Sequence, residues 1–264
     1  MKSNVQPARI AKVIARAGLC SRREAERWIK AGRVSINGKV WKDPAINIDT
    51  VDRVEVDGVA LPVSEPVRVW RYHKPVGLLT TEKDPEKRKT IFDSLPPGLP
   101  RVLSIGRLDM NSEGLLLLTN DGELSRRFEL PAMGWKRHYR VRVFGRPQTD
   151  SLRALANGIS VAGIRYAPIE VKLEDQSGAN GWLTMTLSEG KNREIRKVCQ
   201  YFGWRVNRLI RTGYGPFKLG SLKRGEVEEV HVRKLAELTS QKIISRMQQV
   251  GNRTNSNEKK GRRF

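Results

Sequence analysis

The sequence is poor in the residue types that usually bind metal ions. It has only two cysteines, Cys20 and Cys199, far apart among 264 residues, and its three histidines, His73, His138 and His231, are scattered. Two cysteines cannot form a zinc site unaided, and the histidines show no metal-ligand spacing. We therefore expect no metal site, and we expect both thiols to be reduced.

Signatures of cofactor-dependent enzymes are also missing. The chain contains no G-x-x-x-x-G-K-[ST] phosphate loop, no G-x-G-x-x-G dinucleotide fingerprint and no G-x-S-x-G nucleophile elbow. The fragment EGKNR at 189–193 has a Gly-Lys pair, but it lacks the upstream glycine and the hydroxyl of a phosphate loop. Nucleotide hydrolysis and nicotinamide redox chemistry are thus poorly supported, and we expect no cofactor.

Long apolar runs are absent, because Arg, Lys or Asp interrupts every apolar stretch before it reaches the length that spans a bilayer. The N-terminal residues show no continuous apolar core followed by a small-residue cleavage site, so a secretory signal is not indicated. These features predict a cytoplasmic protein that does not bind membranes.

Acidic residues are few relative to basic ones. Fifty Lys and Arg stand against 28 Asp and Glu, giving a formal net charge of +22. A surplus of this size favours a polyanionic partner, because neutralising phosphates releases their counterions. Charge alone does not separate RNA from DNA or from anionic lipid, and a basic proteome is a further explanation.

The first sixty residues predict a small domain of two helices and a sheet, which we place at 6–64. Apolar side chains share one helical face over 7–17, and Ser21 with Glu24 forms a capping box for a second helix. Asn-Gly at 37–38 and Asp-Gly at 57–58 are strong hairpin signals. Basic residues gather on the helices with few acids between them. An RNA-docking surface is the preferred interpretation and a solvated basic face the alternative, for Arg16, Arg22, Arg23 and Arg27.

A proline-containing linker at 61–66 precedes a larger domain, which we place at 67–248. Its predicted strands alternate as half-buried antiparallel strands do, and its helices do not follow a regular βαβ rhythm, so an α+β fold is expected. The expected strands are 138–144, 169–174, 182–188 and 206–212, and the expected helices are 123–130, 150–158, 193–202 and 233–248. Residues 249–264 predict a basic disordered tail.

The segment LSIGRLDMNSEGLLLLTNDGEL at 103–124 places Asp109 between an apolar stretch and a polar turn, next to Arg107. An aspartate there can be held charged and aimed outward, as a catalytic carboxylate requires. The alternative is an aspartate that closes a turn through its own backbone, which is common. The residues alone leave both interpretations open.

The same segment closely resembles a signature of a known family. GRLDMNSEGLLLLTNDG, at 106–122, is similar to the Gly-Arg-Leu-Asp segment of the RsuA/RluB family of ribosomal RNA pseudouridine synthases. In that family a hydroxyl residue and Gly-Leu-Leu-Leu-Leu-Thr follow the aspartate. Ser112 stands where threonine is frequent, and it keeps the hydroxyl.

Two further segments resemble the same family in the same order. IARAGLCSRREAERWIKAGRVSINGKV, at 14–40, resembles the small alpha-L RNA-binding domain shared with ribosomal protein S-four. The segment at 188–217 resembles the C-terminal family motifs and is most similar to the large-subunit branch, RluB. The resemblance spans about residues 8–235. It implies an alpha-L domain followed by a mainly antiparallel mixed-sheet catalytic domain.

The resemblance also implies functions for individual residues. Asp109 matches the essential aspartate, Tyr139 the active-site tyrosine, and Arg196 the basic residue that pairs with the aspartate. Leu209 falls where the family has an apolar residue that packs against the target base. Arg137 stands where lysine often precedes the tyrosine by two, and it keeps the charge.

The activity implied is conversion of a uridine to pseudouridine in ribosomal RNA, in the 23S large-subunit rRNA, by a cofactor-free monomer. Its expected partner is ribosomal RNA or a pre-ribosomal particle. The target uridine must leave its stack, and basic side chains are expected to line its approach and bind phosphates. These side chains are Arg107, Arg193, Lys197, Arg205, Arg208 and Arg211.

Two other hypotheses remain at this point. A non-catalytic RNA-binding or ribosome-assembly factor would keep the scaffold, although it has no physical need for Asp109, Tyr139 and Arg196 together. A small-molecule enzyme with an incidental basic surface would bind RNA with weak salt dependence.

Overall fold

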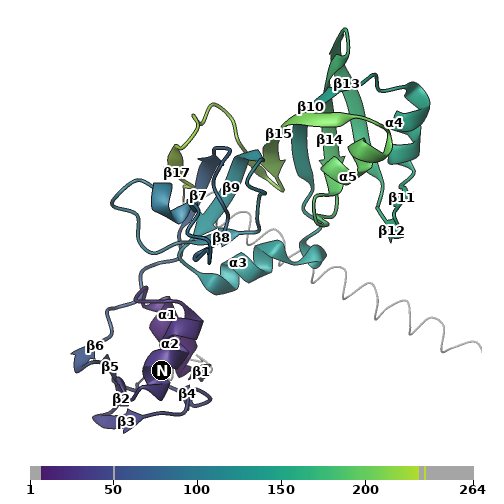
Figure 1. Ribbon diagram of the computed structural model, residues 1–264. Coiled ribbons are helices and arrows are strands. Elements are labelled where there is room, and N and C mark those ends of the chain that lie inside the picture. The colour runs from purple at the N-terminus through teal and green to yellow at the C-terminus, as the bar shows by residue number, and fades with distance from the viewer. Residues whose placement is uncertain (1–6, 50, 232–234, 236–264) are drawn as a thin grey trace, which may run out of the picture. The chain divides into compact units, whose positions relative to one another are not determined.

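The computed structural model describes residues 7–49, 51–231 and 235 (Figure 1). The predicted helix at 233–248, apart from residue 235, and the predicted tail at 249–264 lie outside these ranges. The chain forms two compact units. The first contains the described residues up to Val67 with 97–103 and 119–126, and the second contains the other described residues.

The first unit pairs two short helices with small sheets. Helices α1 (Ile10–Arg16) and α2 (Arg22–Lys30) enclose a core that includes Ile14 and Ile29. A four-stranded sheet has the order β3 (Lys39–Trp41), β2 (Val34–Ile36), β5 (Val54–Val56), β6 (Val59–Ala60), and β1 (Ala8–Arg9) pairs with β4 (Asn47–Ile48). The two helices and the sheet agree with the prediction from the sequence.

Local signals account for the boundaries of these elements. The Ser21 hydroxyl accepts a hydrogen bond from the Glu24 backbone N–H at 3.2 Å, which caps α2 as predicted. Asn37 and Gly38 have φ of 51° and 80°, and the Asp-Gly pair at 57–58 has φ of 52° and 80°. Such pairs of positive φ angles are those of type I′ hairpin turns, so both predicted turns are confirmed.

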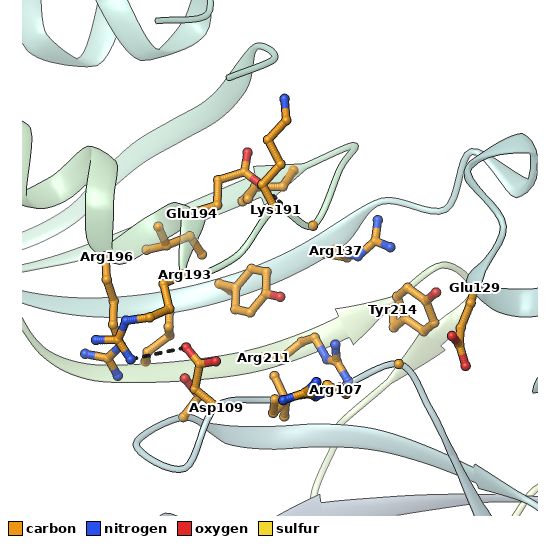
Figure 2. Close-up of a pocket in the computed structure, with 18 residues that line it drawn as sticks. Arg107, Asp109, Glu129, Arg137, Lys191, Arg193, Glu194, Arg196, Arg211 and Tyr214 are labelled. Atoms are coloured by element: carbon orange, nitrogen blue, oxygen red, sulfur yellow. Dashed lines mark hydrogen bonds and ion pairs between the residues drawn. The ribbon is translucent and has the colours of Figure 1, made fainter. Parts of the chain in front are cut away.

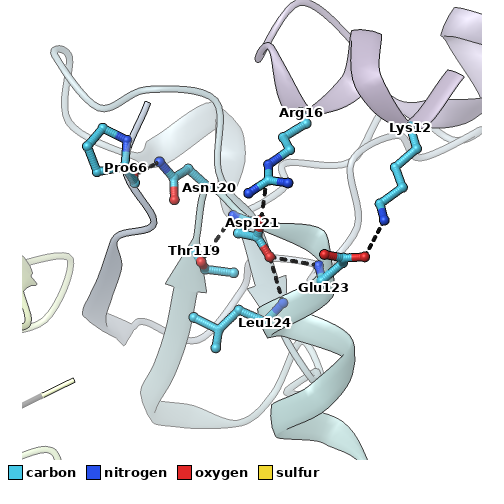
Figure 3. Close-up of polar contacts among 8 residues, drawn as sticks. All are labelled: Lys12, Arg16, Pro66, Thr119, Asn120, Asp121, Glu123 and Leu124. Atoms are coloured by element: carbon cyan, nitrogen blue, oxygen red, sulfur yellow. Dashed lines mark hydrogen bonds and ion pairs between the residues drawn. The ribbon is translucent and has the colours of Figure 1, made fainter. Parts of the chain in front are cut away.

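The segment 119–126 belongs to the first unit, whereas we place it in the second domain from the sequence. Helix α3 (Gly122–Glu129) begins here, and Asp121 Oδ1 accepts hydrogen bonds from the backbone N–H groups of Glu123 and Leu124 at 2.9 and 2.7 Å (Figure 3). Arg16 lies 3.7 Å from Asp121 Oδ2, and Lys12 forms an ion pair with Glu123. Acidic residues at the start of α3 thus neutralise basic residues of α1, a contact between distant residues that no local pattern predicts.

The second unit is built on a nine-stranded sheet. Its main order is β13 (Ile169–Ser177), β14 (Asn180–Leu187), β10 (Arg137–Phe144), β15 (Arg205–Tyr214), β9 (Glu113–Thr119), β7 (Val69–Lys74) and β17 (Val227–Glu229). β8 (Leu103–Ile105) pairs with β9, and β16 (Phe217–Lys218) with β15. The pairs among β13, β14, β10, β15 and β16 are antiparallel, and β15 with β9 is parallel. The α+β prediction is confirmed.

Helices cover one face of this sheet. α4 (Thr149–Ala156) and α5 (Glu194–Tyr201) lie against strands β13 to β15 in Figure 1. Val141 and Val143 of β10 point into this core together with Val198 of α5. Because side chains alternate along a strand, the residues between them, such as Arg142, point to the opposite face. The shorter elements are 3-10 turns at Phe92–Ser94 and Pro131–Met133 and a hairpin of β11 (Ser160–Val161) with β12 (Ile164–Arg165).

The parallel junction between β9 and β15 depends on a glycine. Gly114 has φ of +106° and lies opposite Arg211 in the register. A Cβ at Gly114 would lie 2.7 Å from the backbone nitrogen of Arg211 and closer still to its carbonyl oxygen. Only glycine permits the two backbones to approach this closely.

We therefore expect Gly114→Ala to destabilise the second unit by about 3 kcal/mol or more, because the added methyl group meets backbone rather than a movable side chain. Gly178→Ala is the matched control, since Gly178 also has positive φ (+57°) but nothing lies within 4 Å of an added Cβ. We expect the control to cost about 1 kcal/mol. Urea unfolding of both variants measures the difference, and equal costs would contradict this account of the junction.

Candidate active site

A cavity of about 340 Å³ opens in the second unit beside the β9–β15 junction (Figure 2). Its wall is formed by the loop between β8 and β9, by β10 and β15, and by the segment that leads into α5. The structure brings seven of the predicted site residues together in this wall: Arg107, Asp109, Tyr139, Arg193, Arg196, Leu209 and Arg211. They come from separate parts of the chain, so it is the fold that assembles them.

Asp109 lies in the loop between β8 and β9, and 36% of its side chain is exposed. Its carboxylate therefore reaches the cavity instead of being packed in a core. Arg193 Nη1 lies 3.6 Å from Asp109 Oδ2. The Asp109 carbonyl accepts a hydrogen bond from the backbone N–H of Ser112 at 3.0 Å, which closes the polar turn. Both interpretations of Asp109 from the sequence thus apply in part: its backbone closes a turn, and its side chain faces the cavity.

Lys74 anchors this loop, and the sequence did not identify it as a site residue. Its side chain is fully buried, and Nζ donates hydrogen bonds to the carbonyls of Ser112 at 2.9 Å, Pro75 at 3.0 Å and Asp109 at 3.2 Å. Burial lowers the pKa of Lys74 to about 8, although the nearby Asp109 and Glu113 charges oppose this shift. The sequence signal that could have identified it is the Lys-Pro pair at the end of β7.

Tyr139 and Leu209 form the apolar part of the cavity wall. Tyr139, on β10, is half-buried and lies opposite Arg211 of β15, next to a register shift between His138 and Tyr139. Leu209 is buried and pairs with Val141. A ring and an aliphatic side chain in one cavity suit a flat, partly apolar ligand.

Arg196 does not form the predicted ion pair with Asp109, because Arg193 takes that place. Arg196 Nη2 donates to the Asn111 carbonyl at 2.7 Å and Nη1 to the Val206 carbonyl at 3.4 Å. Burial and the charge of Arg193 lower the pKa of Arg196, and the charge of Asp109 opposes them. The difference has a local cause: Arg193 has left-handed backbone angles (φ 51°, ψ 33°) just before α5, and these angles direct its side chain to Asp109.

Arg211 is a second buried guanidinium in the cavity wall. It is 3% exposed, and its Nε donates to the Leu115 carbonyl at 2.7 Å. Its Nη2 has no hydrogen-bond partner among the described residues. A buried donor without a partner is costly, so its retention beside the cavity favours a role in the site.

Glu194 is a buried carboxyl group under the loop that carries Arg193. One oxygen accepts a hydrogen bond from the Lys191 backbone N–H at 2.9 Å, and Oε1 has no partner among the described residues. Burial, with the neighbouring charge of Glu189, raises the pKa of Glu194 to about 7. Glu189 stays charged, because Lys191 Nζ lies 2.8 Å from its Oε2. The motif EGKNRE contains all of these residues, but their burial is not visible in it.

The structure separates the predicted RNA-contacting residues. The cavity is lined by Arg107, Arg193 and Arg211. It is not lined by Lys197, Arg205 or Arg208. Arg208 alternates with Leu209 along β15 and forms an ion pair with Glu113 instead. Residues on α1 and α2 of the first unit are exposed, as an RNA-docking surface requires: Arg16, Arg22, Arg23 and Arg27.

Two absences among the described residues bear on other functions. In these ranges no group of three or more His, Cys, Asp and Glu side chains is arranged to hold a metal ion. None of the helices described has the length and apolar character that crossing a bilayer requires.

The buried Glu194 predicts a specific dependence of stability on pH. Its folded pKa of about 7 exceeds the ordinary value of 4.5, so the folded protein keeps a proton that the unfolded chain releases. Stability from this group is therefore complete below pH 4.5 and falls as pH rises to about 7, by up to about 3 kcal/mol. We expect Glu194→Gln to flatten this decrease in urea unfolding between pH 5 and 8. Glu170→Gln, which removes an exposed carboxylate paired with Lys136 and not with Glu194, is the control. An unchanged slope in Glu194→Gln would contradict the assignment.

Comparison with known proteins shows the family to which the chain belongs. The RNA pseudouridylate synthase family model matches residues 68–201, and the S4 domain model matches residues 8–54. An uncharacterised RNA pseudouridine synthase of Rickettsia felis is 49% identical over 223 residues, 84% of this chain and 96% of that protein. Ribosomal large subunit pseudouridine synthase B of Escherichia coli is 41% identical over 251 residues, 89% of this chain and 86% of that protein.

A solved pseudouridylate synthase structure is also similar, with a TM-score of 0.60 and 28% identity over 87% of this chain and 99% of that one. The chain belongs to the RNA pseudouridylate synthases, in their RsuA/RluB family, and carries an N-terminal S4 domain.

Proposed function

We propose that this synthase converts a uridine of large-subunit (23S) ribosomal RNA to pseudouridine, with Asp109 as nucleophile and no cofactor. One observation carries the proposal: the Asp109 carboxylate faces a cavity that it shares with Tyr139 and Leu209. The named large-subunit relative in Escherichia coli supports the choice of RNA. A pre-ribosomal particle, a cytoplasmic location, no membrane association and a monomeric state complete the proposal.

The reaction balances without an oxidant or a transferred phosphate. The bond between N1 of uracil and C1′ of ribose breaks, a bond between C5 and C1′ forms, C5 loses a proton and N1 gains one. A carboxylate assists by attacking an electron-poor carbon, either C1′ of the sugar or C6 of the base. Asp109 supplies that carboxylate in both versions.

The neighbours of Asp109 have separate functions in this scheme. The Tyr139 ring and the Leu209 side chain hold the flipped base from the β10 and β15 side of the cavity. The Arg193 guanidinium, 3.6 Å from the carboxylate, orients it toward the base by ion pairing. Arg196 acts as a positioning residue, because its bond to the Asn111 carbonyl fixes the loop two residues beyond Asp109.

RNA recognition outside the cavity falls to basic side chains. Arg107 and Arg193 at the cavity wall are placed to bind phosphates next to the target. The exposed arginines of α1 and α2 in the S4 domain provide a further phosphate-binding surface, and Lys197 on α5 stays a candidate.

Asp109→Asn is expected to lower pseudouridine formation by about 10⁴-fold or more, because the amide cannot act as a nucleophile. RNA affinity should stay within about twofold. Carbodiimide primer extension on rRNA incubated with pure protein and no cofactor measures the product. Asp150→Asn, at a side chain that is 95% exposed, is the matched control. Full activity of Asp109→Asn would refute the enzymatic assignment. Absence of activity in the unaltered protein would favour the non-catalytic RNA-binding factor.

The functions of Arg193 and Arg196 are distinguished by measuring both the catalytic rate and the stability of variants at each position. Arg193→Gln should lower kcat by about 100-fold with little change in unfolding, because its side chain is 47% exposed and its partner is the carboxylate. Arg196→Gln should lower both kcat and stability, since it removes hydrogen bonds to two carbonyls. Single-turnover kinetics and urea unfolding measure the two effects. If Arg193→Gln had full activity, the function assigned to Arg193 would be wrong.

A further inference from the structure

The sheet of the second unit has a face that the catalytic cavity does not use. Side chains that point away from the helix-covered core emerge there from three neighbouring strands, β10, β14 and β15. We call this set the outer face: Arg140, Arg142, Phe144, Trp182, Arg205 and Arg208. None of the six lines the cavity.

Two carboxylates that contact arginines of the outer face, Glu174 and Glu113, are already paired. Arg140 Nε donates to Glu174 at 2.8 Å. Buried Glu113 forms ion pairs with both Arg208 and Arg224, so that cluster keeps an excess positive charge. Burial alone would raise the pKa of Glu113, but the hydrogen bond and charge of Arg208, with Arg224, lower it overall. Glu174 and Glu113 are thus both charged and already paired with a cation.

Two arginines of the outer face have no such partner. Neither Arg142 nor Arg205 forms an ion pair or a hydrogen bond through its side chain in the part of the chain that the structure describes, and both are exposed. Arg142 lies directly opposite Arg208 on the neighbouring strand. Like charges placed directly opposite each other in a sheet are destabilising. An anion bound between these strands would relieve that repulsion.

Aromatic rings interleave with these cations. Arg140 lies over the Trp182 ring at 4.4 Å and Arg205 over the Phe144 ring at 5.1 Å. Phe144 pairs with Arg205 across the strands and is 45% exposed. Guanidinium groups held flat against rings present planar surfaces for stacking and donors for phosphates. Single-stranded RNA is bound by this combination of stacking and phosphate contacts.

We propose that the outer face binds a single-stranded segment of the RNA substrate that is distinct from the segment entering the cavity. Arg142 and Arg205 bind its phosphates, and Phe144 stacks on a base. The inference rests on the proposed RNA substrate and deepens it. The cavity and the outer face lie on opposite sides of the same strands, since Leu209 and Arg208 are adjacent in β15, so one extended loop does not fill both.

The test uses the full chain and fluorescent 20-nucleotide oligouridylate, with anisotropy measured over a range of salt concentrations. The double variant R142Q/R205Q is expected to bind about tenfold more weakly at moderate salt. Its log–log salt slope should fall by about 1.4, because each single-strand phosphate that an arginine neutralises accounts for about 0.7 of the slope. Phe144→Ala should weaken binding about tenfold with an unchanged slope, because stacking releases no counterions.

The control R88Q/R153Q removes the same net charge from exposed arginines that lie off the outer face. Equal losses in both double variants would overturn the proposal, because they would show a general effect of net charge. Unchanged RNA binding by R142Q/R205Q would also overturn the proposal. A protein would then be the alternative partner of the outer face. Circular dichroism melting shows whether each variant is folded.

The result of this binding test does not depend on whether the protein forms pseudouridine. Binding is measured without product formation, and Asp109→Asn should retain both the affinity and the salt slope. If the protein formed no pseudouridine but R142Q/R205Q still bound RNA more weakly, the proposed function would fail and the outer face would stand. If the protein formed pseudouridine and R142Q/R205Q bound RNA as well as the unaltered protein, the proposed function would stand and the outer-face proposal would fail.

Discussion

A single buried ammonium group organises the loop on which the site depends. Lys74 ends strand β7 inside the protein, and its three donors reach the carbonyls of Asp109, Ser112 and Pro75. Burying a charge is costly unless it is fully hydrogen-bonded, so the loop cannot move away without leaving Lys74 unpaired. The same requirement fixes the backbone of Asp109 while its side chain stays free to face the cavity. A rigid loop with a partly exposed carboxylate is what a positioned nucleophile needs.

The sequence predicted the local elements well, because their causes are local. Ser21 with Glu24 and the two hairpin turns act within a few residues, and the alternating strands around the cavity follow from a period of two. Family resemblance then identified Asp109, Tyr139 and Leu209, which the structure brings into one cavity. It failed to predict the partner of Asp109, because Arg193 and Arg196 are three residues apart. Which guanidinium reaches the carboxylate depends on the left-handed backbone at Arg193, and no residue pattern encodes that angle.

The sequence does not show which ionisable side chains are buried. Lys74, Glu194 and Arg211 are almost completely removed from water. Charged residues are seldom buried, so an interpretation based on composition places them on the surface. Their burial comes from contacts between distant parts of the chain, such as the bond from Arg211 to the Leu115 carbonyl. Contacts of the same kind explain why residues 119–126 join the first unit, where Asp121 and Glu123 meet basic side chains of α1.

Because side chains alternate along a strand, the arginines of the second unit lie on two faces of its sheet. We assign a different function to each face. On the cavity face, Arg193 is half-exposed and lies 3.6 Å from the Asp109 carboxylate, and Arg211 is buried, so in the proposed function both act over short distances. On the outer face, Arg142 and Arg205 remain in water, where an isolated charge contributes little to folding. Repulsion between Arg142 and Arg208 even opposes folding. A contribution to stability therefore does not explain why Arg142 and Arg205 are on the outer face. Binding of a polyanion does explain these arginines, because phosphates interact most strongly with cations that have no ion-pair partner within the protein. The two faces of one sheet can therefore serve one substrate, the inner face through chemistry and the outer face through affinity.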